Sequence, residues 1–183
     1  MPEPKKWSVL DQRKTYSTRI FDIRSETSRA PKDGREHEFY VLEMPKWVNI
    51  IAETDTQEIL FIRQYRHGTK DITLEIPGGM VDPEDENAAE GARRELLEET
   101  GYYAGNIEEI GVTAPNPAIQ DNVCATFYAT QLRYEGAQQL DSAEDIQVVK
   151  YPRSKVPELV ASGQISHSLV VVAFVWWLGL GQP

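Results

Sequence analysis

The sequence has 183 residues, of which 40% are hydrophobic and 26% are charged. These proportions are typical of a soluble globular protein, and the length allows one domain to bury a substantial core without disulfides. Acidic residues outnumber basic residues by 29 to 19, and the net charge of −10 argues against an extended nucleic acid as a partner. Small phosphorylated ligands are not excluded, because a bound divalent cation can reverse the local field.

Three features bear on the compartment. The single cysteine, Cys124, cannot form an internal disulfide, which indicates a reducing compartment, and we expect it to be a buried hydrophobe rather than a nucleophile. The N-terminal sequence MPEPKKWSVLDQRK has no apolar stretch of signal-peptide length. The apolar run SLVVVAFVWWLGL is shorter than the roughly 20 residues that span a bilayer, and we interpret it as a buried helix. We therefore expect a cytoplasmic protein with no membrane partner.

The first part of the chain predicts β-strands. Residues 16–42 alternate around the polar turn at 31–34, which indicates a hairpin. Residues 48–52 and 59–65 are rich in β-branched and aromatic side chains, and we expect these two strands to pair antiparallel with each other. A short strand at 72–76 is predicted to end at Pro77 and the two glycines after it.

One helix is predicted from both of its ends. Asn87 can cap the first turn and Glu90, three residues on, can complete a capping box. Gly101 is a stop signal at the other end. Apolar residues between them recur at helical spacing, so one face of the helix can pack on a sheet.

The remaining segments complete a prediction of the fold. Strands are expected at 107–113, 125–132 and 146–151, and helices at 157–162 and 168–180. Strands lie on both sides of one central helix without regular β-α alternation. This order predicts an α+β fold, a sandwich of mixed sheet, rather than a doubly wound sheet.

The predicted helix carries three carboxylates close to its end. Residues three and four apart lie on one side of a helix, so Glu95 projects near both Glu98 and Glu99. Their mutual repulsion is relieved if a cation lies among them, and Mg²⁺ or Mn²⁺ prefers such oxygen ligands. The alternative is a solvated acidic helix face. Gly78 and Gly79 allow the backbone to approach the helix, where a carbonyl could complete the shell of a metal.

The stretch from 78 to 102 resembles the Nudix box, and residues 94–102, RELLEETGY, match every fixed position of its second half. The first half departs slightly. A spacer of seven residues before Arg94 places the first glutamate of the pattern at Glu86, but six residues rather than five then separate Glu86 from Gly79. We attribute the difference to a one-residue insertion in the loop at 82–85. The resemblance implies that Glu86 pairs with Arg94 and braces the loop.

The resemblance also implies a fold, a metal and a reaction. The fold is the Nudix α/β/α sandwich of mixed sheet, here with an N-terminal antiparallel hairpin extension. Glu95 and Glu99 are the principal ligands of Mg²⁺, for which Mn²⁺ can substitute, Glu98 assists, and the Gly78 carbonyl is a further ligand. Family members hydrolyse a nucleoside diphosphate linked to another moiety, with water attacking one phosphorus.

Two further features resemble the ADP-ribose and nucleoside diphosphate sugar pyrophosphatase branch of the family. Pro117 lies sixteen positions beyond Gly101, and residues 74–79 read LEIPGG. By this resemblance Arg66, at the end of the QYR strand, contacts the diphosphate of a small nucleotide substrate, and Glu75 helps to hold the substrate or the attacking water. The alternatives are a surface arginine and a structural glutamate.

The same branch places its general base in a mobile loop before a late strand, which matches residues 143–149, AEDIQVV. Glu144 is the favoured base and Asp145 the alternative. The branch also forms homodimers through an N-terminal sheet. We therefore expect residues 1–45 to be a dimerisation extension and 46–183 the hydrolase domain. Trp7, Tyr16 and Phe21 include candidates for base stacking, with core packing as the alternative.

Together these features predict Mg²⁺-dependent hydrolysis of nucleoside diphosphate sugars, ADP-ribose included, to a nucleoside monophosphate and a sugar phosphate. The alternatives are a Nudix hydrolase of dinucleoside polyphosphates, NADH or oxidised nucleotides, and a catalytically silent nucleotide sensor. The loop at 116–122 departs from the acidic form of dedicated ADP-ribose enzymes, which leaves room for hexose-linked nucleotides. Base, sugar and number of metal ions stay open.

Overall fold

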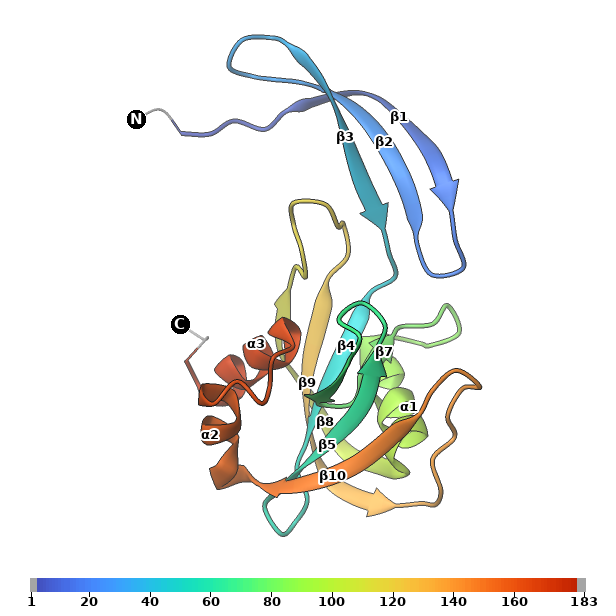
Figure 1. The fold of residues 1–183 in the computed structure, drawn as a ribbon, viewed down its shortest axis with the longest axis vertical. Coiled ribbons are helices and arrows are strands. Elements are labelled where there is room, and N and C mark those ends of the chain that lie inside the picture. The colour runs from blue at the N-terminus through green and yellow to red at the C-terminus, as the bar shows by residue number, and fades with distance from the viewer. Residues whose placement is uncertain (1–2, 181–183) are drawn as a thin grey trace. The chain divides into compact units, whose positions relative to one another are not determined.

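The computed structural model describes residues 3–180 (Figure 1). The chain divides into two compact units. The first holds the residues up to Pro45 together with Ala114–Asn122, and the second holds Lys46–Thr113 and the residues from Val123 onward. Each unit has its own sheets, and they are described in turn.

The first unit is built on a three-stranded antiparallel sheet in the order β1-β2-β3, formed by β1 (Ser8–Ser17), β2 (Asp22–Arg29) and β3 (Glu36–Glu43). The predicted hairpin is present as β2 and β3. Strand β1 was not predicted, because its middle, residues 11–15, is polar and the strand has no buried face. The loop at 114–122 belongs to this unit, where the Leu42 N–H donates to the Ile119 carbonyl over 2.7 Å.

The second unit contains two sheets, in the orders β7-β4-β9-β8 and β10-β5-β6. Strands β4 and β9 pair in parallel, and the other pairs are antiparallel. The strands are β4 (Trp47–Ala52), β5 (Glu58–Arg66), β6 (Asp71–Glu75), β7 (Gly78–Met80), β8 (Tyr102–Thr113), β9 (Cys124–Tyr134) and β10 (Ile146–Pro152). The helices are α1 (Ala88–Thr100), α2 (Val156–Ala161) and α3 (Ser168–Trp177), with a 3-10 turn η1 (Arg153–Lys155) before α2. The mixed α+β class is thereby confirmed.

The expected pairing of β4 with β5 is wrong. The two strands join at one bridge between Glu53 and Ile59 and then enter different sheets. Each strand has a neighbour on both edges and is buried over much of its length. A strand buried in this way needs partners for both rows of backbone groups. Those partners come from β7 and β9 for β4, and from β6 and β10 for β5.

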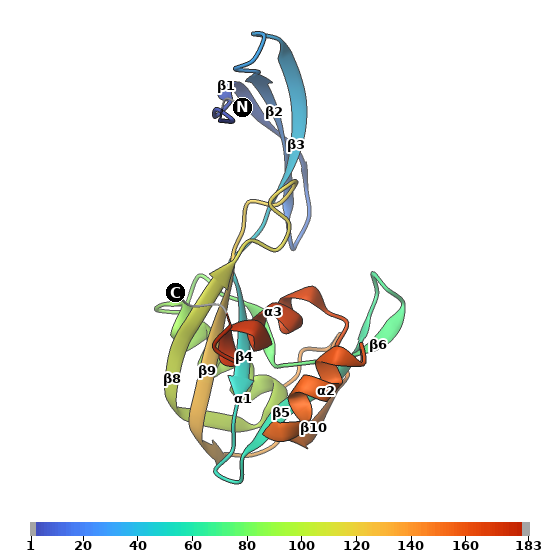
Figure 2. The ribbon, with the colours of Figure 1, turned by 90° about the vertical axis from the view of Figure 1, so that its left-hand side faces the viewer.

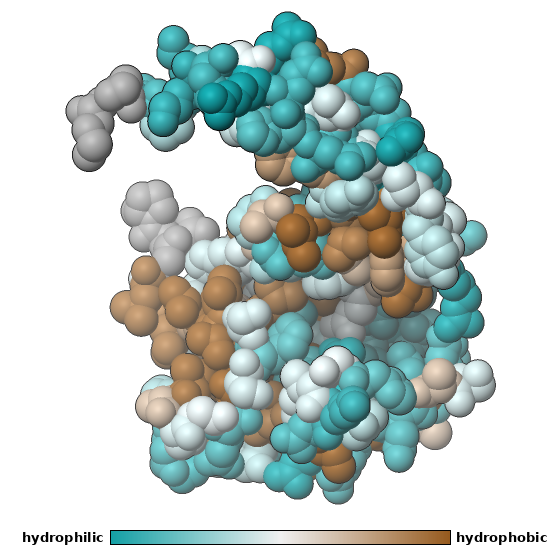
Figure 3. Space-filling model, turned by 45° about the horizontal axis from the view of Figure 1, so that its top comes forward, coloured by the Kyte–Doolittle hydropathy of each residue, from teal (hydrophilic) through white to brown (hydrophobic). Residues whose placement is uncertain are grey.

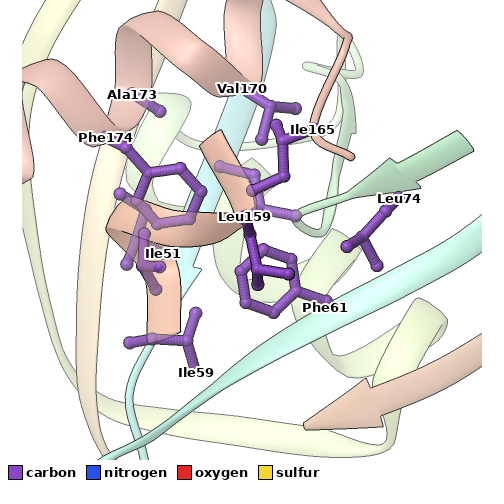
Figure 4. Packing of buried hydrophobic residues seen from close by; sticks show 11 residues of the cluster. Ile51, Ile59, Phe61, Leu74, Leu159, Ile165, Val170, Ala173 and Phe174 are labelled. Atoms are coloured by element: carbon purple, nitrogen blue, oxygen red, sulfur yellow. The ribbon is translucent and has the colours of Figure 1, made fainter. Parts of the chain in front are cut away.

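The core of the second unit has two parts, because successive residues of β4 and β5 point to opposite faces. Ile51 and Phe61 pack with residues of α2 and α3, such as Leu159 and Phe174 (Figure 4). On the other face, Ile50 and Leu60 belong to the cluster that contains Ala92 and Leu96 of α1. Strands β4 and β9 thus lie between α1 on one side and α3 on the other (Figures 1 and 2).

The C-terminal apolar run forms α3, as expected, although the helix ends at Trp177. One face packs in the core through Val170, Ala173 and Phe174. The other face is partly open, since Val175 and Leu178 are exposed. Brown hydrophobic surface is visible on the molecule in Figure 3. Within residues 3–180, no helix is long and apolar enough to cross a membrane.

Candidate active site

The second unit contains a pocket of about 840 Å³. It is bounded by α1, by the turn between β5 and β6, by the loop before β10 and by the start of α3. The seven residues predicted for the site all line it: Arg66, Glu75, Gly78, Glu95, Glu98, Glu99 and Glu144. Segments up to 78 positions apart in the sequence therefore meet at one place, and the individual roles of these residues remain predictions.

Helix α1 is held at both ends by the residues expected from the sequence. The Asn87 side chain accepts N–H groups from Ala89 and Glu90 over 2.9 and 3.1 Å. Gly101 adopts a left-handed backbone with φ 75° and donates its N–H to the Leu97 carbonyl. The second half of the capping box is absent, because the Glu90 carboxylate pairs with Arg93 instead. Caps at both ends, with the Ala92 and Leu96 face packed in the core, fix the direction in which the glutamates project.

Glu99 is the most deeply buried of the three carboxylates, with 3% of the residue exposed. Burial raises its pKa to about 8, although the Gly78 N–H, which donates to Oε2 over 2.9 Å, acts in the opposite direction. Burial also raises the pKa of Glu95 to about 7, where the charge of Glu98 adds to the effect and Arg94 opposes it. Removal from water therefore disfavours the ionised form of both carboxylates, and the neighbouring donors offset only part of this effect.

Gly78 approaches its neighbours so closely that no larger residue fits without movement. A Cβ at this position would collide with the Val48 carbonyl oxygen on the paired strand. The close approach of β7 to β4, and of the Gly78 N–H to Glu99, depends on the missing side chain. The glycine that the sequence pattern contains is thus required by packing.

Arg94 connects the helix to the loop before it. The guanidinium donates to both carboxylate oxygens of Asp85 over 3.1 and 3.0 Å, and to the Met80 carbonyl over 2.9 Å. The expected partner was Glu86, and that prediction is wrong. Asp85 fits because its carboxylate also accepts the Asp82 N–H over 2.8 Å, which folds the loop so that this shorter side chain faces the helix, whereas Glu86 is exposed.

Arg94 also contacts two of the predicted metal ligands. It donates to Glu95 over 3.2 Å and to Glu98 over 3.0 Å. With the side chains in these positions, no three Asp, Glu, His or Cys side chains among the described residues lie close enough together to bind one cation. The donor chemistry nevertheless fits a divalent ion, because hard carboxylate oxygens face the pocket and the pKa values of Glu95 and the buried Glu99 are raised. A cation would compete with Arg94 for Glu95 and Glu98.

Arg66 is oriented by Glu75. The two side chains form a bidentate ion pair, with N–O distances of 2.8 and 2.6 Å, and Thr73 donates to the same carboxylate over 2.5 Å. Burial alone would raise the pKa of Glu75, but Arg66 and Thr73 lower it below the usual value. The Glu75 carboxylate is buried, whereas 42% of the Arg66 side chain is exposed. Arg66 can therefore meet a ligand directly, and Glu75 positions it.

Glu144 lies in the loop before β10 and is exposed. Its Oε2 atom accepts the Asp141 N–H over 3.0 Å, so the side chain stabilises the turn of its own loop. The alternative base, Asp145, is not among the residues that line the pocket. Position thus favours Glu144 over Asp145.

Asn49 on β4 and His167 at the start of α3 are two of the polar residues of the pocket that lie outside the predicted set. The His167 side chain makes no capping bond, and burial lowers its pKa. Within the described part of the chain, its Nδ1 and the Nδ2 of Asn49 are buried without a hydrogen-bond partner. No local pattern marks either residue, because the fold alone brings them to the pocket.

Known proteins resemble this chain in sequence. Residues 43–167 match the model of the NUDIX domain. The ADP-ribose pyrophosphatase of Bacillus subtilis (strain 168) is 27% identical over 158 residues, which cover 86% of this chain and 84% of the relative. The GDP-mannose pyrophosphatase of Salmonella paratyphi B is 26% identical over 176 residues, 90% of this chain and 91% of the relative.

A solved structure shows the same fold. The crystal structure of an ADP compounds hydrolase superposes with a TM-score of 0.84 at 23% identity, and the match covers 100% of both chains. The matching family model spans more than half of the chain and includes the carboxylate helix and the loop with Glu144. This protein belongs to the Nudix family.

Proposed function

We propose that this protein is a magnesium-dependent pyrophosphatase that hydrolyses nucleoside diphosphate sugars, ADP-ribose among them. The products are a nucleoside monophosphate and a sugar phosphate. The observation that carries the proposal is the convergence of the carboxylates of α1, the oriented Arg66 and the exposed Glu144 on one pocket. The names of the two pyrophosphatase relatives support the substrate class.

Different residues of the chain have different roles in the proposed reaction. Mg²⁺, held by Glu95, Glu98, Glu99 and the Gly78 carbonyl, supplies positive charge to the diphosphate when bound, and Mn²⁺ can replace it. Arg66 binds the diphosphate in the orientation that Glu75 imposes.

Glu144 is the general base. Its carboxylate breaks the hydrogen bond with the Asp141 N–H and accepts a proton from the attacking water. The water oxygen forms a bond to one phosphorus, the bond from that phosphorus to the bridging oxygen breaks, and the bridging oxygen leaves with the other phosphate.

We also propose a cytoplasmic homodimer. The first unit, which includes residues up to 45, is the dimerisation extension, and the residues from 46 onward carry the hydrolase site. Apolar side chains of the three-stranded sheet support a second copy as the partner. The rings of Trp7 and Phe39 contact each other edge to face, with 5.3 Å between their centroids. The exposed fractions are nevertheless 44% for Trp7 and 42% for Phe39. Analytical ultracentrifugation tests this, because Phe39→Asp is expected to convert the dimer to a monomer.

The decisive experiment is a panel of nucleotides with Mg²⁺ and product identification by chromatography. We expect turnover of ADP-ribose and hexose-linked nucleoside diphosphates, with little turnover of dinucleoside polyphosphates, NADH or oxidised nucleotides. Ligand binding without any product would instead favour a sensor.

Glu99→Gln is expected to lower kcat by about 10²-fold or more, because the variant loses the charge at the centre of the ligand set. Glu90→Gln is the matched control, since this glutamate is on the same helix but does not line the pocket. If Glu99→Gln keeps the wild-type rate at saturating Mg²⁺, the metal assignment is wrong.

A further inference from the structure

The C-terminal end of α1 is completed by the segment that leads to Glu144. The last carbonyl groups of a helix have no partner within the helix and need donors from elsewhere. Gln139 donates its N–H to the Glu98 carbonyl over 2.8 Å, and the Gln138 Nε2 donates to the Glu99 carbonyl over 2.5 Å. Two residues that are predicted to hold metal with their side chains are therefore capped, through their backbone, by the start of the Glu144 loop.

The Gln138 side chain also reaches the other end of the same loop. Its Nε2 donates to the Ile146 carbonyl over 3.1 Å, and Ile146 is the buried first residue of β10. One amide group thus holds the beginning of the loop, the end of the loop and the helix together. The segment between residues 139 and 145 is therefore held at both ends.

We infer that Gln138 is a positioning residue that sets where Glu144 lies relative to the carboxylates of α1. This rests on the proposed function, in which Glu144 is the base. A base is effective only within hydrogen-bond reach of the water that it deprotonates, and small displacements of a catalytic group lower the rate strongly. Fixed ends also reduce the number of conformations that the loop must give up when it closes on substrate.

The test compares Gln138→Met with Gln147→Met. Methionine keeps the length of the side chain but removes both N–H donors. Gln147 is exposed, adjoins the same loop end and does not line the pocket, so it is the matched control. We expect Gln138→Met to lower kcat about tenfold and to change KM less than about twofold. Backbone amides 140–145 should exchange hydrogen faster than in the wild type. The control should change neither quantity.

A double-mutant cycle distinguishes positioning from a general loss of structure. In a Glu144→Gln background, Gln138→Met should lower kcat by less than about twofold, because the group that it positions is already removed. An equal loss in both backgrounds would overturn the inference, as would a wild-type kcat in Gln138→Met. If Glu144→Gln alone keeps the wild-type kcat, the assignment of the base fails. Amide exchange in Gln138→Met then still decides whether Gln138 holds the loop.

Discussion

Arg94 shows how one residue can serve two structures. Its guanidinium contacts Asp85 in the loop, Glu95 and Glu98 on the helix, and the Met80 carbonyl at the end of β7. Arginine suits this position because its donors are arranged in a rigid fork and its charge persists at every physiological pH. The acidic partners raise the pKa of Arg94 still further. The loop path and the charge balance of the pocket therefore depend on the same side chain.

Replacing Asp85 tests the loop brace. Asp85→Asn removes the charge from two hydrogen bonds with Arg94 and should lower the free energy of unfolding by about 1–3 kcal/mol at pH 7. The exposed neighbour Glu86 provides the control, since Glu86→Gln should change stability by less than about 0.5 kcal/mol. Urea denaturation measures both variants.

The effect of Asp85→Asn should depend on pH. The Arg94 hydrogen bonds lower the pKa of Asp85 in the folded protein. A carboxylate with a lowered pKa stabilises the fold at pH values above its unfolded pKa of about 4, and this contribution is lost as the pH falls through the folded pKa. The difference between wild type and Asp85→Asn should therefore shrink below about pH 4. A constant difference from pH 7 to pH 3 would contradict the charged brace.

At the scale of elements, α1 could be predicted closely from the sequence, whereas the strand pairing could not. Asn87 and Gly101 act on backbone groups within a few residues of themselves, so their signal is local. The partners β9 of β4 and β10 of β5 lie far along the chain, and nothing in residues 47–66 indicates them. The closeness of β4 and β5 in the sequence favoured a hairpin between them. Burial on both faces instead requires a partner strand on each edge, and both strands have such partners.

The end of α1 offers a test in which strain and collision can be separated. Gly101→Ala forces alanine into a left-handed backbone with φ 75°, and the new Cβ would collide with the Gly136 carbonyl oxygen. Gly163→Ala is the control, because Gly163 has φ 76° and no atom within 4 Å of a built Cβ. The left-handed conformation alone costs about 1–2 kcal/mol.

We expect Gly163→Ala to lose that amount and Gly101→Ala to lose at least about 2 kcal/mol more, since the segment that caps the helix must move. Thermal and chemical denaturation measure both. Equal losses would show that the collision is relieved without cost.

For the molecule as a whole, the Nudix box predicted α1 and its three glutamates. The resemblance to the family indicated Arg66, Glu75 and Glu144, all of which line the pocket. Other residues that line the site or border it were not predictable in the same way. Asn49, Gln138 and His167 belong to no local pattern, and their positions result from strands and helices that pack after long loops. The sequence therefore indicates the residues expected to carry the reaction better than it indicates the residues around them.

The charge balance of the pocket predicts that removal of metal leaves the protein folded. Arg94 already partners Glu95 and Glu98, and the Gly78 N–H partners Glu99. In excess EDTA we expect a cooperative unfolding transition to persist. Mg²⁺ at about ten times its Kd should raise Tm by about 3–6 °C, the amount expected from binding alone. Differential scanning calorimetry checks this, and loss of the transition in EDTA would show that the ion is structural.

The pairing of β4 with β9 and of β5 with β10 has a consequence for biosynthesis. Ile50 pairs with Phe127, and Phe61 pairs with Val149. Neither sheet of the second unit can be completed on the ribosome until these late strands have emerged, whereas the strands of the first unit pair with close neighbours in the sequence. The apolar β4 and β5 must each wait with one edge unpaired, and long-range pairing of this kind is slow. Nascent chains halted between β5 and β10 should therefore aggregate more readily than the completed protein.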